Sequence, residues 1–188
     1  MSSIKIRQAS AQDIPLVHRL AKQVFFSTYE PLQPKEKVAY LFSIMYSEAA
    51  LTEQMEKKNH VFLLVEDVSG YLGYASYELN YKESGKIKIH KIYVMPNAQG
   101  KGVGREIIDS IADIASHNKV EILVLDVYRH NPAIHFYEKL GFKKVGEQVT
   151  EVGNGFVMDD FVMEMDVWAS ENFATQNCIF LKVERYKL

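Results

Sequence analysis

The spacing of apolar residues divides the chain into a helical N-terminal part and a β-rich remainder. Alternation over residues 4–7 predicts a first strand. Apolar residues at helical spacing over 14–25 predict an amphipathic helix. Its start is marked by Ser10 and Asp13. The Ser10 hydroxyl can accept from an unpaired backbone N–H, and the Asp13 carboxylate can accept from the Ser10 backbone N–H in return. We expect a second helix to begin near Pro34, followed by a short third one.

The β-rich remainder opens with a predicted hairpin, whose strands cover 61–65 and 71–79. The run over 122–127 is almost wholly apolar, which is typical of a central strand covered on both faces. The other expected elements are a strand over 86–95, helices over 103–115 and 132–140, and a closing hairpin over 142–149 and 156–167. This order predicts a mixed α/β domain whose middle strand–helix–strand unit is parallel and right-handed.

Composition narrows the class of protein. The 188 residues suit one domain, which we assign to 1–168, with 169–188 as a C-terminal tail of uncertain order. A formal net charge of −2 gives no basic excess, so we expect neither a nucleic acid nor a membrane as partner. No stretch approaches the roughly 20 apolar residues of a membrane helix, and residues 1–12 carry no signal-peptide pattern. The single cysteine, Cys178, excludes an internal disulfide and suits a cytoplasmic location.

A glycine-rich loop lies between the strand over 86–95 and the helix over 103–115. Glycines allow close backbone approach and positive φ. The first amides of a helix lack internal partners and carry partial positive charge, so such a loop can bind phosphate oxygens. A glycine-rich turn without a ligand is the alternative. The loop residues are Gln99, Gly100, Lys101, Gly102, Val103 and Gly104.

Two familiar glycine loops do not fit. A Walker-type loop requires Ser or Thr after Gly-Lys, whereas Gly102 follows Lys101 here. A dinucleotide fingerprint requires a glycine where Arg105 stands, and it follows an early strand of a parallel sheet. Both interpretations are therefore weak.

The loop resembles the pyrophosphate loop of the GCN5-related N-acetyltransferase (GNAT) superfamily, Gln-x-x-Gly-x-Gly, through Gln99, Gly102 and Gly104. Residues 131–142 resemble the second signature of that family, and the likeness covers roughly residues 4–167. Residues 39–41, 90–94 and 153–165 look most like the PaiA-type spermine/spermidine acetyltransferases. The resemblance implies the GNAT fold, a mixed central sheet with splayed parallel strands four and five, flanked by helices. It also implies acetyl transfer from acetyl-CoA to a primary amine.

The resemblance further implies how acetyl-CoA, the co-substrate, would be held. Backbone groups of Ile92, Tyr93 and Val94 would pair with the pantetheine arm as an added strand does. Backbone amides over 99–104 would hold the pyrophosphate, and Lys101 or Arg105 could add charge or be solvated surface residues. The family often places a cofactor-contacting asparagine three residues before Ala-Ile, whereas Asn131 stands two before it, where it can also cap the following helix. The cofactor-binding residues expected are Ile92, Tyr93, Val94, Gln99, Gly100, Lys101, Gly102, Val103, Gly104, Arg105 and Asn131.

The strand over 86–95 carries a second mark of an active site. Ile87 and Ile89 share one face, whereas the next apolar pair, Ile92 and Val94, lies out of phase. A β-bulge at residues 90–91 would produce this slip, and bulges often lie next to active sites. A strand that is apolar on both faces at one end is the alternative. In acetyltransferases of this type such a bulge helps to splay two parallel strands.

Acetyl transfer needs a base for the amine, a donor that polarises the carbonyl and help for the departing thiolate. Tyr137 is the candidate acid, because the family's tyrosine at this place sits near the thioester sulfur; packing against the sheet is its structural alternative. His90 is the candidate base, although related sequences often carry a glutamate there. The backbone N–H of Val94 is the expected polarising donor. We expect no metal site, since His130 and His135 are poorly spaced.

The acceptor is expected to be a small polyamine-like amine, with acidic residues Asp159, Asp160 and Glu30 near its distal ammonium or merely solvated. Two alternatives stay open. A protein N-terminus or lysine as acceptor would need a wider groove and fewer acidic pocket residues. A non-enzymatic acetyl-CoA-binding regulator would bind acetyl-CoA without releasing thiol. The oligomeric state also stays open, with a homodimer as one option.

Overall fold

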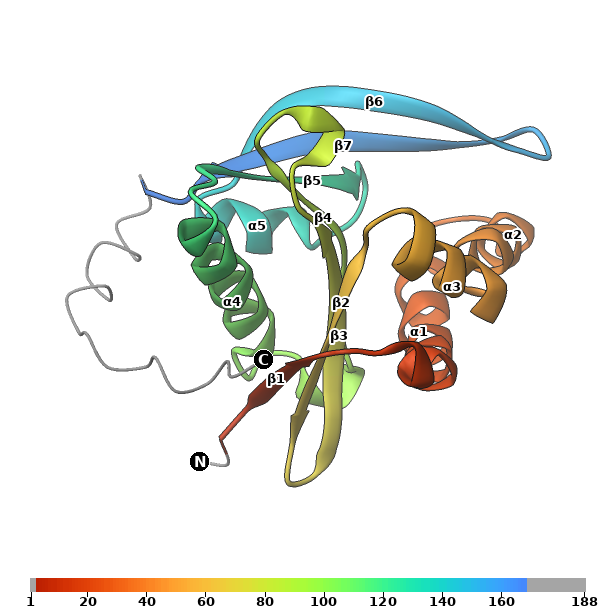
Figure 1. Cartoon of the computed structure of the whole chain (residues 1–188). Coiled ribbons are helices and arrows are strands. Elements are labelled where there is room, and N and C mark those ends of the chain that lie inside the picture. The colour runs from red at the N-terminus through yellow and green to blue at the C-terminus, as the bar shows by residue number, and fades with distance from the viewer. Residues whose placement is uncertain (1–2, 169–188) are drawn as a thin grey trace.

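The computed structural model describes residues 3–168 (Figure 1). The expected tail over 169–188, with Cys178, lies outside the described residues. The strands are β1 (Lys5–Gln8), β2 (Val61–Asp67), β3 (Gly70–Glu78), β4 (Ile87–Val94), β5 (Ile122–Tyr128), β6 (Lys143–Gly153) and β7 (Phe156–Asp166). The helices are α1 (Ile14–Tyr29), α2 (Lys35–Tyr46), α3 (Glu48–Lys57), α4 (Val103–His117) and α5 (Ile134–Leu140). No helix within the described residues is long and apolar enough to span a membrane.

One sheet of seven strands, in the order β1-β2-β3-β4-β5-β7-β6, runs between two groups of helices. Helices α1, α2 and α3 lie on one side of the sheet and α4 and α5 on the other (Figure 1). All neighbouring strands are antiparallel except β4 and β5, which are parallel and joined through α4. The predicted mixed α/β domain and its parallel strand–helix–strand unit are therefore confirmed.

Each side of the sheet has its own hydrophobic core. On the α4 side, Ile107 and Ile111 are fully buried in the cluster that contains Leu123 of the apolar strand β5. On the α1 side, Val17 and Phe25 pack in the cluster that contains the sheet residues Leu64 and Tyr74. Burial of an aliphatic or aromatic side chain contributes about 1.5–3 kcal/mol, so these two layers hold the sheet between them.

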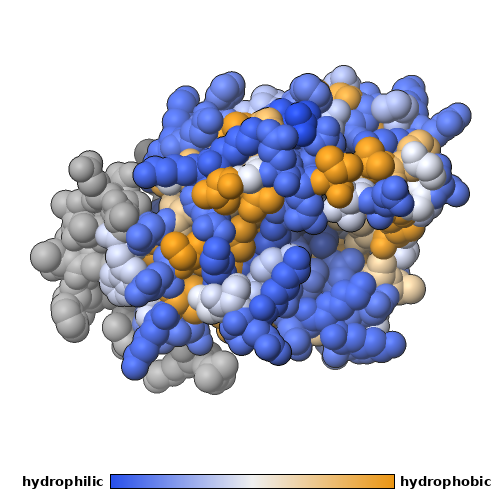
Figure 2. Space-filling view, turned by 90° about the horizontal axis from the view of Figure 1, so that it is seen from above, coloured by the Kyte–Doolittle hydropathy of each residue, from blue (hydrophilic) through white to orange (hydrophobic). Residues whose placement is uncertain are grey.

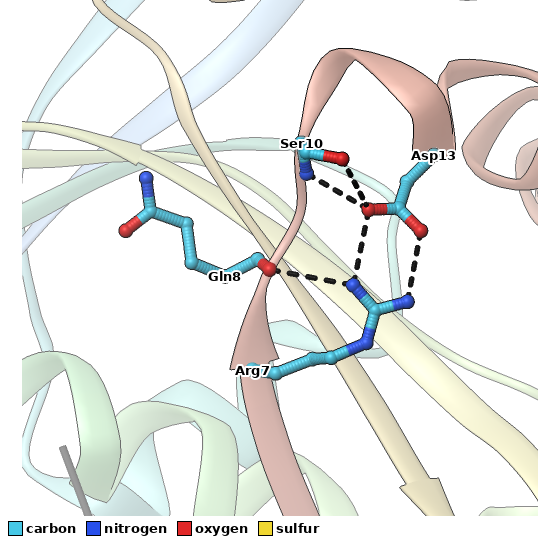
Figure 3. Close-up of polar contacts among 4 residues, drawn as sticks. All are labelled: Arg7, Gln8, Ser10 and Asp13. Atoms are coloured by element: carbon cyan, nitrogen blue, oxygen red, sulfur yellow. Dashed lines mark hydrogen bonds and ion pairs between the residues drawn. The ribbon is translucent and has the colours of Figure 1, made fainter. Parts of the chain in front are cut away.

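The start of the first helix is fixed by a polar cluster that includes a residue of β1 (Figure 3). The Ser10 backbone N–H donates to the Asp13 carboxylate at 2.8 Å, as the predicted cap requires. The Arg7 guanidinium donates to the same carboxylate at 2.8 Å and 3.0 Å. These bonds hold the pKa of Asp13 well below its usual range. The cluster thus ties the first strand to the turn that enters α1.

The helix expected over 132–140 begins two residues later than predicted, at Ile134. The side-chain oxygen of Asn131 accepts from the Ala133 N–H at 2.9 Å, which holds a turn before the helix rather than its first residue. Gly141 ends the helix with φ 103°, the left-handed conformation expected there.

The hairpin of β6 and β7 forms one edge of the sheet and turns at residues 153–155, as expected. Its outer strand β6 is largely exposed, and Val145 and Val149 on it lie open to solvent. The face seen in Figure 2 is mostly hydrophilic, with separate apolar patches. These surface features do not identify a dimer interface, so the homodimer named above as one option stays a prediction.

The predicted slip in the fourth strand is a β-bulge at His90. Tyr77 of β3 pairs with Ile89, whereas the preceding residue, Ser76, pairs with Lys91. His90 is the extra residue and has no partner in β3. Such an insertion bends a strand and increases its local twist.

The bulge decides which core each later residue of β4 joins. Ile92 and Val94 pack against the same core as Ile87 and Ile89, on the α4 side. Without the extra residue their side chains would point to the opposite side, because alternate residues of a strand face opposite sides. Lys91 is sent instead into the core beneath α1, α2 and α3.

Lys91 is a buried cation in an apolar layer. Its Nζ donates to the Gln54 side-chain oxygen at 2.7 Å and lies 5.3 Å from the Tyr46 ring centroid and 5.6 Å from that of Phe62. Burial, with a smaller contribution from Lys58, lowers the pKa of Lys91 from 10.5 to about 7. No carboxylate hydrogen-bonds to it, so its charged form is costly.

We predict that Lys91→Met stabilises the protein at neutral pH by about 1–3 kcal/mol. The variant removes the cost of burying the lysine charge, and part of this gain is offset because Gln54 loses its partner. The unfolded chain binds more protons than the folded one between pH 7 and 10.5, so wild-type stability should rise across that window. The advantage of the variant should therefore shrink by about 2 kcal/mol between pH 6.5 and pH 9. Urea denaturation at both pH values measures it. An advantage independent of pH would contradict the lowered pKa of Lys91.

Candidate active site

The candidate site is the cleft that opens where β4 and β5 separate. The two strands pair over three positions only, the last being Ile89 with Leu125. Beyond that point β5 continues to pair with β7, while β4 continues to pair with β3. A cavity of about 930 Å³ lies there, lined by β4, the glycine loop, the end of α1 and α5. The predicted splay of the two parallel strands is therefore present.

The glycine loop has the backbone conformation that phosphate binding requires. Gly100 and Gly102 have φ of 74° and 85°, in the left-handed region that favours glycine. Gly102 caps α4, which begins at Val103, so the unpaired amides of the first turn face the cleft side of the loop. Lys101 and Arg105 are exposed beside it. The loop therefore fits a pyrophosphate group.

The last loop residue, Gly104, brings α4 close to α5. A Cβ atom at this position would lie 2.9 Å from Cζ of Phe136 on α5. Both residues line the cleft, so the missing side chain lets the aromatic ring form the wall. The glycine at this position is thus explained by close packing rather than by positive φ.

The backbone of β4 turns hydrogen-bonding groups toward the cleft at alternate positions. The Met95 N–H donates to the Leu72 carbonyl of β3 at 2.8 Å. Because backbone groups alternate along a strand, those of Tyr93 also face β3, while those of Ile92 and Val94 face the cleft. Of the three residues expected to pair with an added strand, Ile92 and Val94 therefore turn their backbone groups to the cleft, whereas Tyr93 turns its own to β3.

The expected donor and base both line the cleft. Tyr137 projects from α5 with its side chain partly buried. Burial, with a smaller effect from Tyr29, raises the pKa of Tyr137, so the phenol keeps its proton at neutral pH. His90 enters from the bulge on β4. Asn131 is buried in the same cleft, and its oxygen holds the turn before α5.

A cluster of tyrosines beside the cleft is a feature that the sequence did not predict. The Tyr46 hydroxyl donates to the Tyr93 hydroxyl at 3.0 Å, and the Tyr93 ring stacks on that of Tyr74 at 5.4 Å. The Tyr29 hydroxyl interacts with Tyr93 and Asn131. Burial raises the pKa of all four phenols. These residues read as ordinary apolar positions of helices and strands, so no pattern marked them as one cluster.

The acidic residues expected near the acceptor behave differently from one another. Asp159 forms an ion pair with Arg129 at 2.5 Å, and Glu30 is exposed. Asp160 is half-buried, and burial together with Asp126 raises its pKa to about 6. Asp126 lines the cleft and pairs with the buried Lys88. Of Asp159, Asp160 and Glu30, it is therefore Asp160 that lies near the cleft without a salt-bridge partner of its own within residues 3–168.

His60, Glu78 and His90 form a polar cluster that sequence reasoning missed. The His90 Nε2 lies 2.9 Å from the Glu78 carboxylate, and the His60 Nε2 lies 4.0 Å from it. The two imidazole rings stack at 3.7 Å. Among the described residues this is the one group of three His, Cys, Asp or Glu side chains whose possible ligand atoms all lie within 4.8 Å of one another. His60 lies just before β2, Glu78 ends β3 and His90 is the bulge residue within β4, and their spacing in sequence gives no motif.

Comparisons with known proteins agree with this geometry. A family model described as "Acetyltransferase (GNAT) domain" matches residues 30–165. Thialysine N-epsilon-acetyltransferase of Mus musculus is 27% identical over 162 residues, covering 78% of this chain and 88% of that protein.

Two solved structures share the fold. PaiA N-acetyltransferase from Thermoplasma acidophilum, in complex with coenzyme A, has a TM-score of 0.71 at 23% identity, covering 87% of this chain and 99% of that one. Mutant forms of the spermidine/spermine N-acetyltransferase SpeG from Vibrio cholerae have a TM-score of 0.63 at 23% identity, covering 93% of this chain and 98% of theirs.

The chain therefore belongs to the GNAT acetyltransferase family. It is an acetyl-CoA-dependent N-acetyltransferase, as the predicted fold and loop indicated.

We predict that Gly104→Val weakens acetyl-CoA binding by about 10-fold or more, because a loss of about 1.4 kcal/mol of binding free energy lowers the affinity tenfold. The new side chain would collide with Phe136 and push it into the cleft. Isothermal titration calorimetry with coenzyme A measures the change. Gly146→Ala is the matched control, because a Cβ there meets only Val162, at an ordinary 3.9 Å. Equal affinities in both variants would contradict the assignment of this wall to the cofactor.

Proposed function

We propose that the protein transfers the acetyl group of acetyl-CoA to a primary amine of a small, polyamine-like acceptor. The proposal is supported by three features that line one cleft: the backbone groups of β4 that face the cleft, the glycine loop and Tyr137. Transfer of this kind is direct and needs no covalent nucleophile, and the hydroxyl of Ser27 in the cleft lining donates to backbone carbonyls of α1 at 2.9 Å and 3.1 Å.

Acetyl-CoA, when bound, supplies the activated acetyl group as a thioester. The backbone groups of Ile92 and Val94 bind and orient its pantetheine arm, and the Val94 N–H polarises the reacting carbonyl. The loop from Gln99 to Gly104 binds the pyrophosphate, while Gln99 also donates through its side chain to the Val94 carbonyl at 3.2 Å. This last bond ties the loop to the strand, so both binding elements keep one geometry.

Tyr137 donates its proton to the departing thiolate. Its raised pKa, caused by burial, makes the phenol a weak acid that stays protonated until a strong base develops beside it. His90 accepts the proton that the amine loses. It lines the cleft from the bulge of β4, next to the diverging ends of the parallel strands.

The acceptor would bind at the end of the cleft near Asp126 and Asp160. Asp126 is paired with Lys88, whereas Asp160 lies close enough to Tyr29 to affect its pKa. A carboxylate and phenol oxygens together suit an ammonium group. The neighbours' names support this class of acceptor, since they include a spermidine/spermine and a thialysine acetyltransferase.

We predict that Tyr137→Phe lowers kcat by about 10- to 1,000-fold, the usual worth of general acid catalysis, because the thiolate loses its proton donor. Affinity for acetyl-CoA and the melting temperature should stay near the wild-type values. Thiol release at saturating substrate measures kcat. An unchanged kcat with intact acetyl-CoA binding would exclude this role of Tyr137.

We predict that Asp160→Asn raises KM for 1,4-diaminobutane about 10-fold but leaves KM for butylamine within about twofold, because only the diamine carries a second ammonium. Wild-type KM for the diamine should fall as pH rises through 6, where Asp160 becomes charged. Asp159→Asn is the control, since Arg129 already pairs with Asp159. Equal effects of Asp160→Asn on both amines would contradict this site for the distal ammonium.

A further inference from the structure

His90 and Glu78, which are in contact, line two different cavities. His90 lines the acetyl-CoA cleft. Glu78 and His60 line a second cavity of about 930 Å³, which lies at the ends of β2 and β3 beside α3. The bond between His90 and Glu78, 2.9 Å long, joins the wall of one cavity to the wall of the other.

We propose that His90, Glu78 and His60 form a proton relay, which carries the proton lost by the acceptor amine from the cleft into the second cavity. This inference rests on the proposed function of the cleft. It assigns Glu78 and His60 as positioning residues that act on the amine only through His90.

The contact with Glu78 fixes which nitrogen of His90 faces the amine. An ionised carboxylate can only accept, so the Nε2 of His90 must carry the proton that it donates to Glu78. The Nδ1 is then left with a free lone pair. This is the tautomer that a base in the cleft needs, and the same carboxylate–imidazole logic orients the base of a catalytic triad.

The proton balance closes within the three residues. The ammonium of the acceptor gives one proton to Nδ1 of His90, directly or through a water, and becomes a neutral nucleophile. In the same event the Nε2 proton of His90 passes to Glu78, so His90 stays neutral but becomes the Nδ1–H tautomer. Glu78 releases that proton to His60 or to water in the second cavity. Proton exchange of His90 with water, one proton given and one taken, then restores the Nε2–H tautomer. One proton enters and one leaves, and no bond between heavy atoms changes.

The charges around the cluster favour such a concerted transfer. Lys88 and Lys91 on β4 and Lys58 after α3 face the two imidazoles, while Lys82 acts on Glu78, and the ring of Tyr81 packs edge-on against His90. Burial, with Lys91 and Lys58, lowers the pKa of His60 to about 4. Burial, followed by His60, Lys91 and Lys88, lowers the pKa of His90 to about 2.

A lone imidazole in this field would be a poor base, because it could not hold a second proton. Transfer of the Nε2 proton to Glu78 in the same event avoids the imidazolium. Burial raises the pKa of Glu78, which suits a carboxylate that takes up a proton transiently. The same lysines disfavour a divalent cation among these side chains, although their types could ligate one.

The first test compares Glu78→Gln with wild type in kcat as a function of pH. The variant keeps the size and a polar contact but cannot take up a proton. We expect kcat to fall about 10- to 100-fold at pH 7, with KM for acetyl-CoA unchanged, and to keep rising with pH where wild type has levelled. Glu83→Gln, in the same second cavity, is the control and should match wild type. A wild-type pH profile in Glu78→Gln would overturn the relay.

Chemical rescue separates proton transfer from structural support. Glu78→Ala should regain at least about tenfold in kcat with added formate, which can enter through the second cavity, whereas Glu83→Gln should not respond. Absence of rescue in a folded Glu78→Ala would overturn the relay. Loss of wild-type activity on EDTA treatment, restored by Zn²⁺, would replace the relay by a metal site.

A nitrogen-15 NMR measurement of the histidine rings decides the arrangement without any acetyl transfer. We expect His90 as the Nε2–H tautomer in wild type and a mixture of tautomers in Glu78→Gln, with His90→Gln used to assign the signals. A wild-type Nδ1–H tautomer would overturn the relay even if amines are acetylated. The predicted tautomer with no acetylation of any amine would instead contradict the proposed function.

Discussion

The site depends on the place at which the parallel pairing of β4 and β5 stops. Ile89 and Leu125 form the last pair, and the next residue of β4, His90, is inserted as a bulge. Each strand beyond this point keeps its outer neighbour, so the sheet stays intact while its centre opens. The cleft, the backbone groups of β4 that face it and the position of His90 all belong to this one irregularity. The bulge also keeps Ile92 and Val94 in the same core as Ile87.

A second constraint is the burial of polar groups around the opening. The tyrosine hydroxyls, Lys91, His90 and Glu78 are all drawn into low-dielectric surroundings, and burial is the first cause of every one of their pKa shifts. Such groups cost stability unless they are paired. Their concentration at the bulge is typical of a functional site, where stability is given up for a preset protonation state. The phenols stay protonated and the imidazoles stay neutral, which are the states that acid and base need.

Much of this arrangement could be predicted because it depends on patterns within short stretches of the sequence. Period-two and period-3.6 patterns place the elements, the glycines place the loop, and the slip between Ile89 and Ile92 places the bulge. The features that could not be predicted are contacts between residues that lie far apart in the sequence. Nothing in the spacing of His60, Glu78 and His90 shows that these three side chains meet. The pairing of Asp159 with Arg129 also depends on the register of β6, β7 and β5. The direction of the Tyr93 backbone likewise follows from pairing with β3, which no local pattern reveals.

The central claim is that one cleft binds acetyl-CoA and a small amine for direct transfer. Thiol release from acetyl-CoA, measured with spermidine, spermine, small diamines, amino acids and a short peptide, tests it most directly. The account predicts rapid release with the polyamines and diamines, and release near background with the peptide. Release with the peptide alone, or with no amine although acetyl-CoA binds, would contradict it.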